Sequence, residues 1–167
     1  MDHKPGQVRQ PEQHPHIMNN KTVSFLSLAV IGMIAMACQA FSPDQGHDPW
    51  TAQQLMPPAE LAKQIKEGKA AEFHVFNIGP SGAILGSVEI GEGRDSGNIA
   101  KLKTRLSELP KDANVVVYCG CCPFKNCPNV RPAMKLINEM QFTNGKLLDL
   151  RENLKVDWID QGYPMAD

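Results

Sequence analysis

The sequence lacks an excess of either charge, with 17 lysine and arginine residues against 18 aspartate and glutamate residues. This balance gives no basis for a nucleic-acid partner, which a strongly basic surface would attract. The chain also lacks an internal repeat and a glycine-rich phosphate-binding loop, so the sequence implies no organic cofactor. Its 167 residues leave room for one domain with a short extension.

Cysteine is sparse and unevenly placed. The chain has 5 cysteines, and four of them lie in the segment 119–127. A framework of structural disulfides would spread its cysteines along the chain to join distant segments. The clustering therefore favours a reactive or metal-binding site in this one segment.

The N-terminal part of the chain is typical of an export signal. Residues 1–17 are polar, and we expect either a disordered extension or a start assigned too early, because Met18 begins a more ordinary signal. Residues 18–38 combine one lysine, an apolar stretch of signal-peptide length and small residues before Cys38. The stretch is short for a membrane span, which needs roughly 20 residues.

The ending Ile34-Ala35-Met36-Ala37-Cys38 resembles a bacterial lipobox, whose cysteine is lipidated and becomes the new N-terminus. The resemblance implies that Cys38 is the lipidation site and that several acyl chains hold the protein on a membrane. Plain secretion after cleavage near Ala40, or an uncleaved anchor, stay open as alternatives. Residues 39–49 are polar and irregular, which indicates a tether. We expect an exported protein of the bacterial periplasm or cell envelope.

Helix and strand patterns alternate from residue 50 onward. Apolar spacing, together with proline and glycine positions, predicts helices over 57–68, 98–109, 132–140 and 156–162, and strands over 74–78, 83–90, 114–118 and 146–150. Such alternation is typical of an α/β domain with a central, mainly parallel sheet flanked by helices. The segment 114–118 is almost wholly apolar, which suits a strand buried on both faces.

The cysteine-rich loop follows this most strand-like segment and precedes a helix. In open α/β sheets, sites form beyond the carboxyl ends of the strands, where the next helix begins. Backbone N–H groups at a helix start can hold an anion and lower the pKa of a thiol. We therefore expect the chemistry in this active-site loop, which reads Cys119-Gly120-Cys121-Cys122-Pro123-Phe124-Lys125-Asn126-Cys127.

Several segments resemble, in their order and spacing, parts of the rhodanese family. They are the strand and nucleophile Val115-Val116-Val117-Tyr118-Cys119, the helix end Glu139-Met140-Gln141-Phe142, the closing strand 147–150, Trp158, and Gly162-Tyr163-Pro164. The resemblance implies a rhodanese-like domain over residues 50–167. The cysteine loop is longer than the usual loop of that family and has more cysteines.

The resemblance implies a sulfurtransferase or persulfide carrier. In that reading, the Cys119 thiolate accepts a sulfane sulfur from a small donor, such as thiosulfate or a persulfide, and passes it to a thiol or other thiophilic acceptor, which can be a protein. Amides of the loop would stabilise the anionic sulfur. Arg131 and Asn77 are candidate substrate-binding residues, and Lys125 is a candidate for lowering the pKa of a nearby thiol.

Other uses of the same loop stay open. A thiol–disulfide redox site would use Cys119 or Cys122 as the attacking thiolate and Cys127 as the resolving thiol. Thiolates also suit soft metals such as Cu(I) or Zn(II), and that site would use Cys119, Cys121, Cys122 and Cys127. In an inactive domain the cysteines would form a structural disulfide. Because adjacent cysteines rarely pair, Cys127 with Cys121 or Cys122 is then the favoured pair.

Overall fold

The computed structural model describes Met1 and residues 48–167. The rest of the expected extension, the signal segment with Cys38, and all of the tether except its last two residues lie outside the described residues. Within residues 48–167, no helix has the length and apolar character that crossing a membrane requires.

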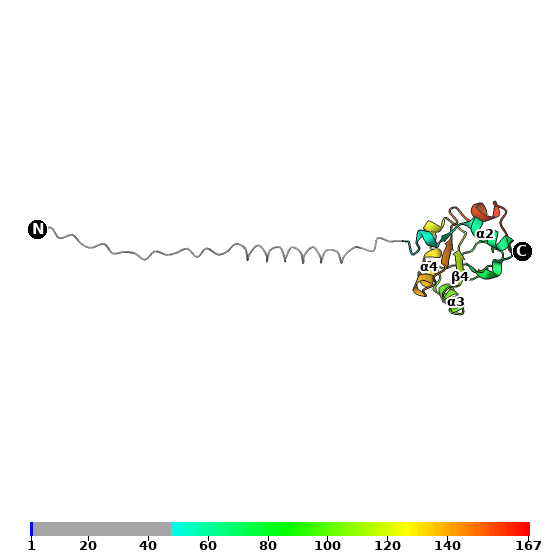
Figure 1. Cartoon of the computed structure of the whole chain (residues 1–167). Helices are drawn as coiled ribbons and strands as arrows, with labels where there is room; N and C mark the ends of the chain where they lie inside the picture. Colours follow the sequence, from blue (N-terminus) through cyan, green and yellow to red (C-terminus); the bar gives the residue numbers. More distant parts are fainter. Residues whose placement is uncertain (2–47) are drawn as a thin grey trace. The chain divides into compact units, whose positions relative to one another are not determined.

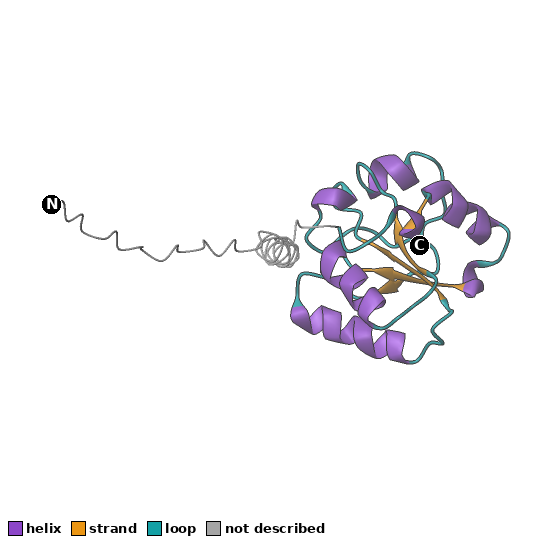
Figure 2. Ribbon diagram, turned by 60° about the vertical axis from the view of Figure 1, so that its left-hand side comes forward, coloured by secondary structure: helices purple, strands orange, loops and turns teal. Residues whose placement is uncertain are grey.

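Five strands form one parallel sheet at the centre of the domain (Figure 2). The strands are β1 (Leu55–Met56), β2 (Phe73–Asn77), β3 (Val88–Glu89), β4 (Asn114–Tyr118) and β5 (Gly145–Leu148), and their spatial order is β1-β5-β4-β2-β3. Strand β4 is therefore the middle strand. Parallel neighbours need crossover connections, which helices provide here. The predicted α/β class, with a parallel sheet flanked by helices, is confirmed.

Helices cover both faces of the sheet. The longer ones are α2 (Pro58–Lys66), α3 (Ser96–Ser107) and α4 (Val130–Glu139). Short helical turns are η2 (Ala52–Gln54), η3 (Ala70–Glu72), η4 (Phe124–Asn126) and the π-helical η5 (Lys155–Ile159). Helices α3 and α4 pack in one apolar core, and α2 and η5 pack in the other. In Figure 1, β4 accordingly lies between α2 and α3.

Strand β4 is buried on both faces, as its sequence predicts. Val115 and Val117 pack in the core that contains α3 and α4, whereas Val116 and Tyr118 pack in the core that contains α2. All four are 0% exposed. This division follows from the alternation of side chains along a strand. The strand ends at Tyr118, so Cys119 is the first residue beyond its carboxyl end.

Two predicted elements differ from the structure. The strand predicted over 83–90 is reduced to the short β3 and an isolated antiparallel bridge between Ile84 and Met165. Gly86 lies between these pieces with a φ of 82°, a left-handed conformation that interrupts a strand. The helix predicted over 156–162 is the single π-helical turn η5. Strand β1 was not predicted, because two residues are too few to show the alternation of apolar and polar side chains that marks a strand.

The last two residues of the predicted tether contact the domain. Asp48 Oδ1 accepts a hydrogen bond from Arg131 Nη2 at 2.7 Å, and the carbonyl of Pro49 accepts one from Asn138 Nδ2 at 2.6 Å. Trp50, which follows them, is buried and packs edge-on against Phe124 with ring centroids 5.7 Å apart. Contacts to the domain therefore reach at least two residues upstream of residue 50.

Candidate functional site

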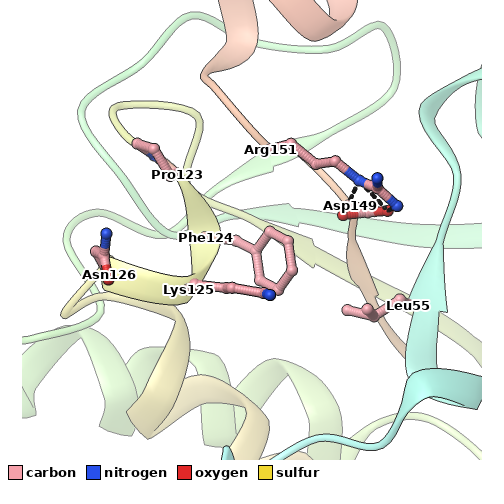
Figure 3. A pocket seen from close by; sticks show the side chains of 7 residues that line it. All are labelled: Leu55, Pro123, Phe124, Lys125, Asn126, Asp149 and Arg151. Atoms are coloured by element: carbon pink, nitrogen blue, oxygen red, sulfur yellow. Dashed lines mark hydrogen bonds and ion pairs between the residues drawn. The ribbon is translucent and has the colours of Figure 1, made fainter.

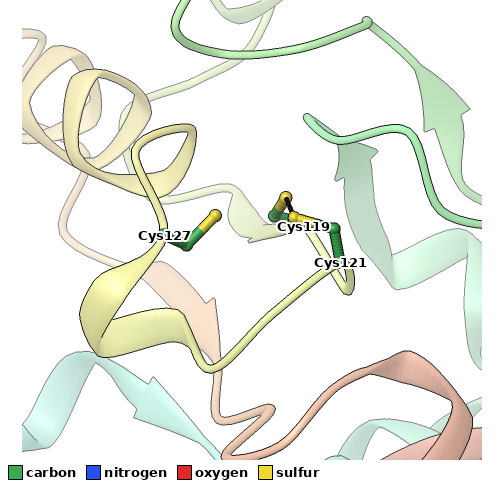
Figure 4. Close-up of side chains that lie close together, drawn as sticks. All are labelled: Cys119, Cys121 and Cys127. Atoms are coloured by element: carbon green, nitrogen blue, oxygen red, sulfur yellow. Dashed lines mark hydrogen bonds between the residues drawn. The ribbon is translucent and has the colours of Figure 1, made fainter.

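Cys119 lies at the carboxyl end of the central strand and is only 3% exposed. Its Sγ lies 3.2 Å from the Sγ of Cys121, which is exposed. Cys127 approaches from the far end of the loop and is fully buried. The three sulfur atoms all lie within 4.8 Å of one another, as Figure 4 illustrates. We call Cys119, Cys121 and Cys127 the thiol cluster. All three thiols are free.

A sharp backbone turn after β4 folds the loop back over Cys119. Gly120 has a φ of 71°, which lies in the left-handed region that favours glycine. A Cβ at this position would also lie 2.6 Å from Ser81 Oγ and 2.7 Å from Leu154 Cβ. The carbonyl of Gly120 accepts a hydrogen bond from the backbone N–H of Leu154 at 2.9 Å. Only glycine fits this turn, and the turn places the exposed Cys121 beside the buried Cys119.

The segment after β2 forms a wall against Cys119. Gly79 has no room for a Cβ, because the Sγ, Cα and carbonyl oxygen of Cys119 occupy that space. Asn77 is fully buried and shapes this segment: its Oδ1 accepts from the N–H of Gly79 at 3.0 Å, and its Nδ2 donates to the carbonyl of Ser81 at 2.8 Å and to Glu89 Oε1 at 3.0 Å. The Ser81 hydroxyl in turn donates to the carbonyl of Cys119. Asn77, a predicted substrate-binding residue, thus uses both ends of its amide to position this wall.

The side-chain amide of Asn129 donates to Cys119, and the sequence did not predict this contact. Asn129 is 3% exposed, and its Nδ2 donates to Cys119 Sγ at 3.2 Å. Its Oδ1 accepts from the backbone N–H of Arg94 at 3.1 Å. Asn129 occupies the N-cap position of α4, yet its side chain makes no capping hydrogen bond. From the sequence, an asparagine just before a helix indicates an ordinary cap, so nothing in the sequence linked it to the thiol.

The pKa of the Cys119 thiol is raised well above its ordinary value. The largest cause is its hydrogen bond with the Cys127 side chain, and burial adds to the effect. The Asn129 amide and the backbone N–H of Cys121 act in the opposite direction. Burial is also the main cause that raises the pKa of Cys121 and of Cys122. The expectation of a lowered thiol pKa at the helix start is therefore wrong for the free site: Cys119 is a protonated thiol at neutral pH.

The remaining loop residues hold the loop in place. Phe124 is buried, and its N–H donates to the carbonyl of Leu150 at 3.2 Å. Cys122 is half-buried, and its Sγ lies 3.3 Å from the Sγ of Cys121 but outside the thiol cluster. The guanidinium of Arg131 is engaged by Asp48, by the carbonyl of Lys125 at 3.1 Å and by the ring of Trp50 at 5.2 Å. An anionic donor at Arg131 would therefore have to compete with a carboxylate.

A cavity of about 450 Å³ lies beside the loop (Figure 3). Its lining residues come from β1, from the loop and from the segment after β5, and they are Leu55, Pro123, Phe124, Lys125, Asn126, Asp149 and Arg151. Arg151 forms an ion pair with Asp149 at 3.0 Å. Lys125 is the other cation that lines this cavity. None of the lining residues is a cysteine. The cavity is thus a neighbour of the thiol cluster, and the cluster itself is reached from the exposed side of Cys121.

Comparison with known proteins assigns no family to the chain. No family model matches it, and no curated protein matches it. The geometry of the loop is therefore what points to a function. This geometry consists of a buried thiol at the end of the central strand, a donor amide from the next helix, and two further thiols within reach.

Proposed function

We propose that the domain is a rhodanese-like sulfurtransferase or persulfide carrier, and that Cys119 holds the transferred sulfur. The position of Cys119 supports the proposal: its Sγ lies just beyond the carboxyl end of β4, with Asn129 Nδ2 at 3.2 Å. The backbone N–H of Cys121 also stabilises the anionic form of this sulfur. Donors that are fixed before reaction stabilise a developing negative charge without reorganisation. These two donors suit a sulfur that carries negative charge during transfer, and they act against Cys127 and burial, which raise the pKa of the resting thiol.

The proposed sulfur transfer has two steps. The Cys119 thiolate attacks the outer sulfur of thiosulfate, the S–S bond breaks, and sulfite leaves with the bonding electron pair. A thiophilic acceptor then attacks the outer sulfur of the Cys119 persulfide, and Cys119 leaves as the thiolate. No external oxidant or reductant is consumed. The proton of the resting thiol passes to solvent before the first attack, because only the thiolate is nucleophilic.

The location of the domain is part of the same proposal. The lipobox-like ending at Cys38 supports an anchor on the outer side of the cytoplasmic membrane, with the tether 39–49 between lipid and domain. The sulfur donor would then be a small molecule outside the cytoplasm, and the acceptor a small thiol or a protein. Membrane fractionation tests this: Cys38→Ser should move the protein from the membrane fraction to the soluble fraction. An unchanged distribution would exclude a lipid anchor at Cys38.

Intact-mass measurement tests the sulfur-carrier function. The reduced protein is incubated with thiosulfate or a persulfide donor, and the expected product is heavier by about 32 Da, the mass of one sulfur, as in persulfidation. The added sulfur should map to Cys119 and be removed by cyanide. Cys119→Ser should gain nothing. Addition of sulfur to another cysteine while Cys119 stays unmodified would refute the assignment.

A second candidate function is thiol–disulfide exchange, favoured by the 3.2 Å between the sulfur atoms of Cys119 and Cys121. Here two thiols would reduce an external disulfide, which takes up their two hydrogens as a pair of thiols. By this distance, Cys121 is the better candidate for the resolving thiol that pairs with Cys119. The sequence favoured Cys127 as the resolving thiol. The same mass measurement separates the two functions. Oxidation to a disulfide lowers the mass by about 2 Da and adds no sulfur.

A further inference from the structure

The third thiol of the cluster, Cys127, is not a reacting group in the chemistry proposed above. Sulfur transfer needs Cys119, and disulfide exchange needs Cys119 with one partner. Cys127 is nevertheless 0% exposed, and its sulfur lies within 4.8 Å of both other sulfur atoms of the cluster. It is carried there by η4, whose last residue is Asn126. Figure 4 shows the Cys127 side chain directed across the loop toward the other two.

We propose that Cys119, Cys121 and Cys127 form a binding site for a soft monovalent metal ion, Cu(I). Metal–thiolate bonds are about 2.3 Å long, so two such bonds span at most about 4.6 Å. Sulfur atoms that lie within 4.8 Å of one another therefore need only small side-chain rotations to share one ion. Soft sulfur ligands select Cu(I) over hard divalent ions.

The ligand set distinguishes Cu(I) from Zn(II). Structural zinc sites are four-coordinate, with ligands supplied by the protein. Among residues 48–167, the only group of three or more histidine, cysteine or carboxylate ligands close enough to share an ion is these three cysteines. Cys122 lies next to Cys121 but is not part of that group. Cu(I) accepts an all-sulfur site of low coordination, whereas zinc would have to take its remaining ligand from solvent.

The surroundings of the cluster suit a bound cation. The Asn129 amide donates to Cys119 Sγ at 3.2 Å and so fixes the orientation of one ligand, as second-shell groups do in metal sites. A bound cation would deprotonate the thiols that hold it, because metal coordination deprotonates thiols. Copper enters and stays as Cu(I), so no electron is transferred, and the thiol protons pass to solvent.

A competition titration tests the proposal. The reduced full chain, in detergent and under anaerobic conditions, is titrated with Cu(I) against a chromophoric Cu(I) chelator of known affinity. We expect one Cu(I) per chain, a thiolate-to-copper absorption in the near ultraviolet, and an affinity that increases with pH because protons are released. Cys127→Ala should weaken binding by more than the about 10–100-fold that loss of a second-shell contact costs.

The matched control is Cys122→Ala, the same change in the same loop but outside the cluster. It should keep the affinity of the original chain within about threefold, well below the loss that a ligand change causes. Equal losses in both variants, wild-type affinity in Cys127→Ala, or preferential binding of Zn(II) by the same thiols would each overturn the proposal. Sulfur loading of Cys119 in Cys127→Ala is measured in parallel. Failure of metal binding is thereby distinguished from failure of sulfur transfer.

Discussion

Replacing Asn129 by alanine removes the side-chain amide that donates to Cys119 Sγ at 3.2 Å. A hydrogen bond to a charged group contributes about 1.5–3 kcal/mol. Both the thiolate and the anionic persulfide of Cys119 would accept this bond more strongly than the neutral thiol does. Because about 1.4 kcal/mol corresponds to a tenfold change, we expect the initial rate of sulfur loading at neutral pH to fall about 10- to 100-fold. The rate should recover as the pH is raised, since more of the thiol is then ionised.

The assay is the rate of sulfur addition mapped to Cys119, followed as a function of pH. Alanine also removes the acceptor for the Arg94 N–H, a bond of 3.1 Å that stabilises the fold. Asn129→Asp therefore serves as a second variant, because it keeps an acceptor for Arg94 while placing a negative charge near the sulfur. Aspartate should slow loading more than alanine does. Loading of Asn129→Ala at the original rate, with an unmoved pH profile, would refute the assigned role of Asn129.

Other predictions concern the framework around the site. Gly79→Ala should lower the free energy of unfolding by about 1–3 kcal/mol in urea titration, because the new methyl group collides with Cys119; Gly82→Ala, which meets only the end of a flexible side chain, is the control and should lose less. The pKa of Tyr118 is raised chiefly by burial, so the folded chain keeps a proton that the unfolded chain releases above about pH 10. Stability should therefore decline above that pH, and Tyr118→Phe should make the decline shallower, while the thiols with raised pKa keep their own contribution; an unchanged slope would contradict this. Trp50→Ala should cost about 3–5 kcal/mol by loss of a buried ring, whereas Asp48→Ala, which breaks an exposed ion pair, should cost less than about 1 kcal/mol.

The central elements of the fold could be predicted because their signals are local. Strand β4 has the predicted bounds, since its apolar run is continuous and is followed directly by the cysteine loop, which contains Gly120 and Pro123. Helices α2, α3 and α4 begin and end within about two residues of expectation, because proline, glycine and apolar spacing mark them. The edge strands β1 and β3 are only two residues long and depend on pairing with neighbours, which a sequence window does not contain.

The site was predictable only where its residues are close in sequence. The cysteine loop is evident because its four thiols lie together. The residues that surround Cys119 come from separate segments: Gly79 follows β2, and Asn129 begins α4. Each has an ordinary local explanation, as a turn glycine and as a helix cap. The Cys127 side chain and the burial of Cys119 together raise the pKa of this thiol, and both depend on how these segments pack, which has no sequence signal of its own.

The two proposals place opposite demands on Cys127, and one substitution measures both. Its side chain is the largest cause that raises the pKa of Cys119, so in sulfur transfer Cys127 holds the attacking group in its unreactive form. In the proposed metal site, the same thiol is one of the three ligands. Cys127→Ala should therefore speed alkylation and sulfur loading of Cys119 at neutral pH while weakening Cu(I) binding, as measured by mass mapping and by chelator competition. If Cys127 only filled the core, its replacement by alanine would leave sulfur loading and Cu(I) binding unchanged and would lower only the free energy of unfolding.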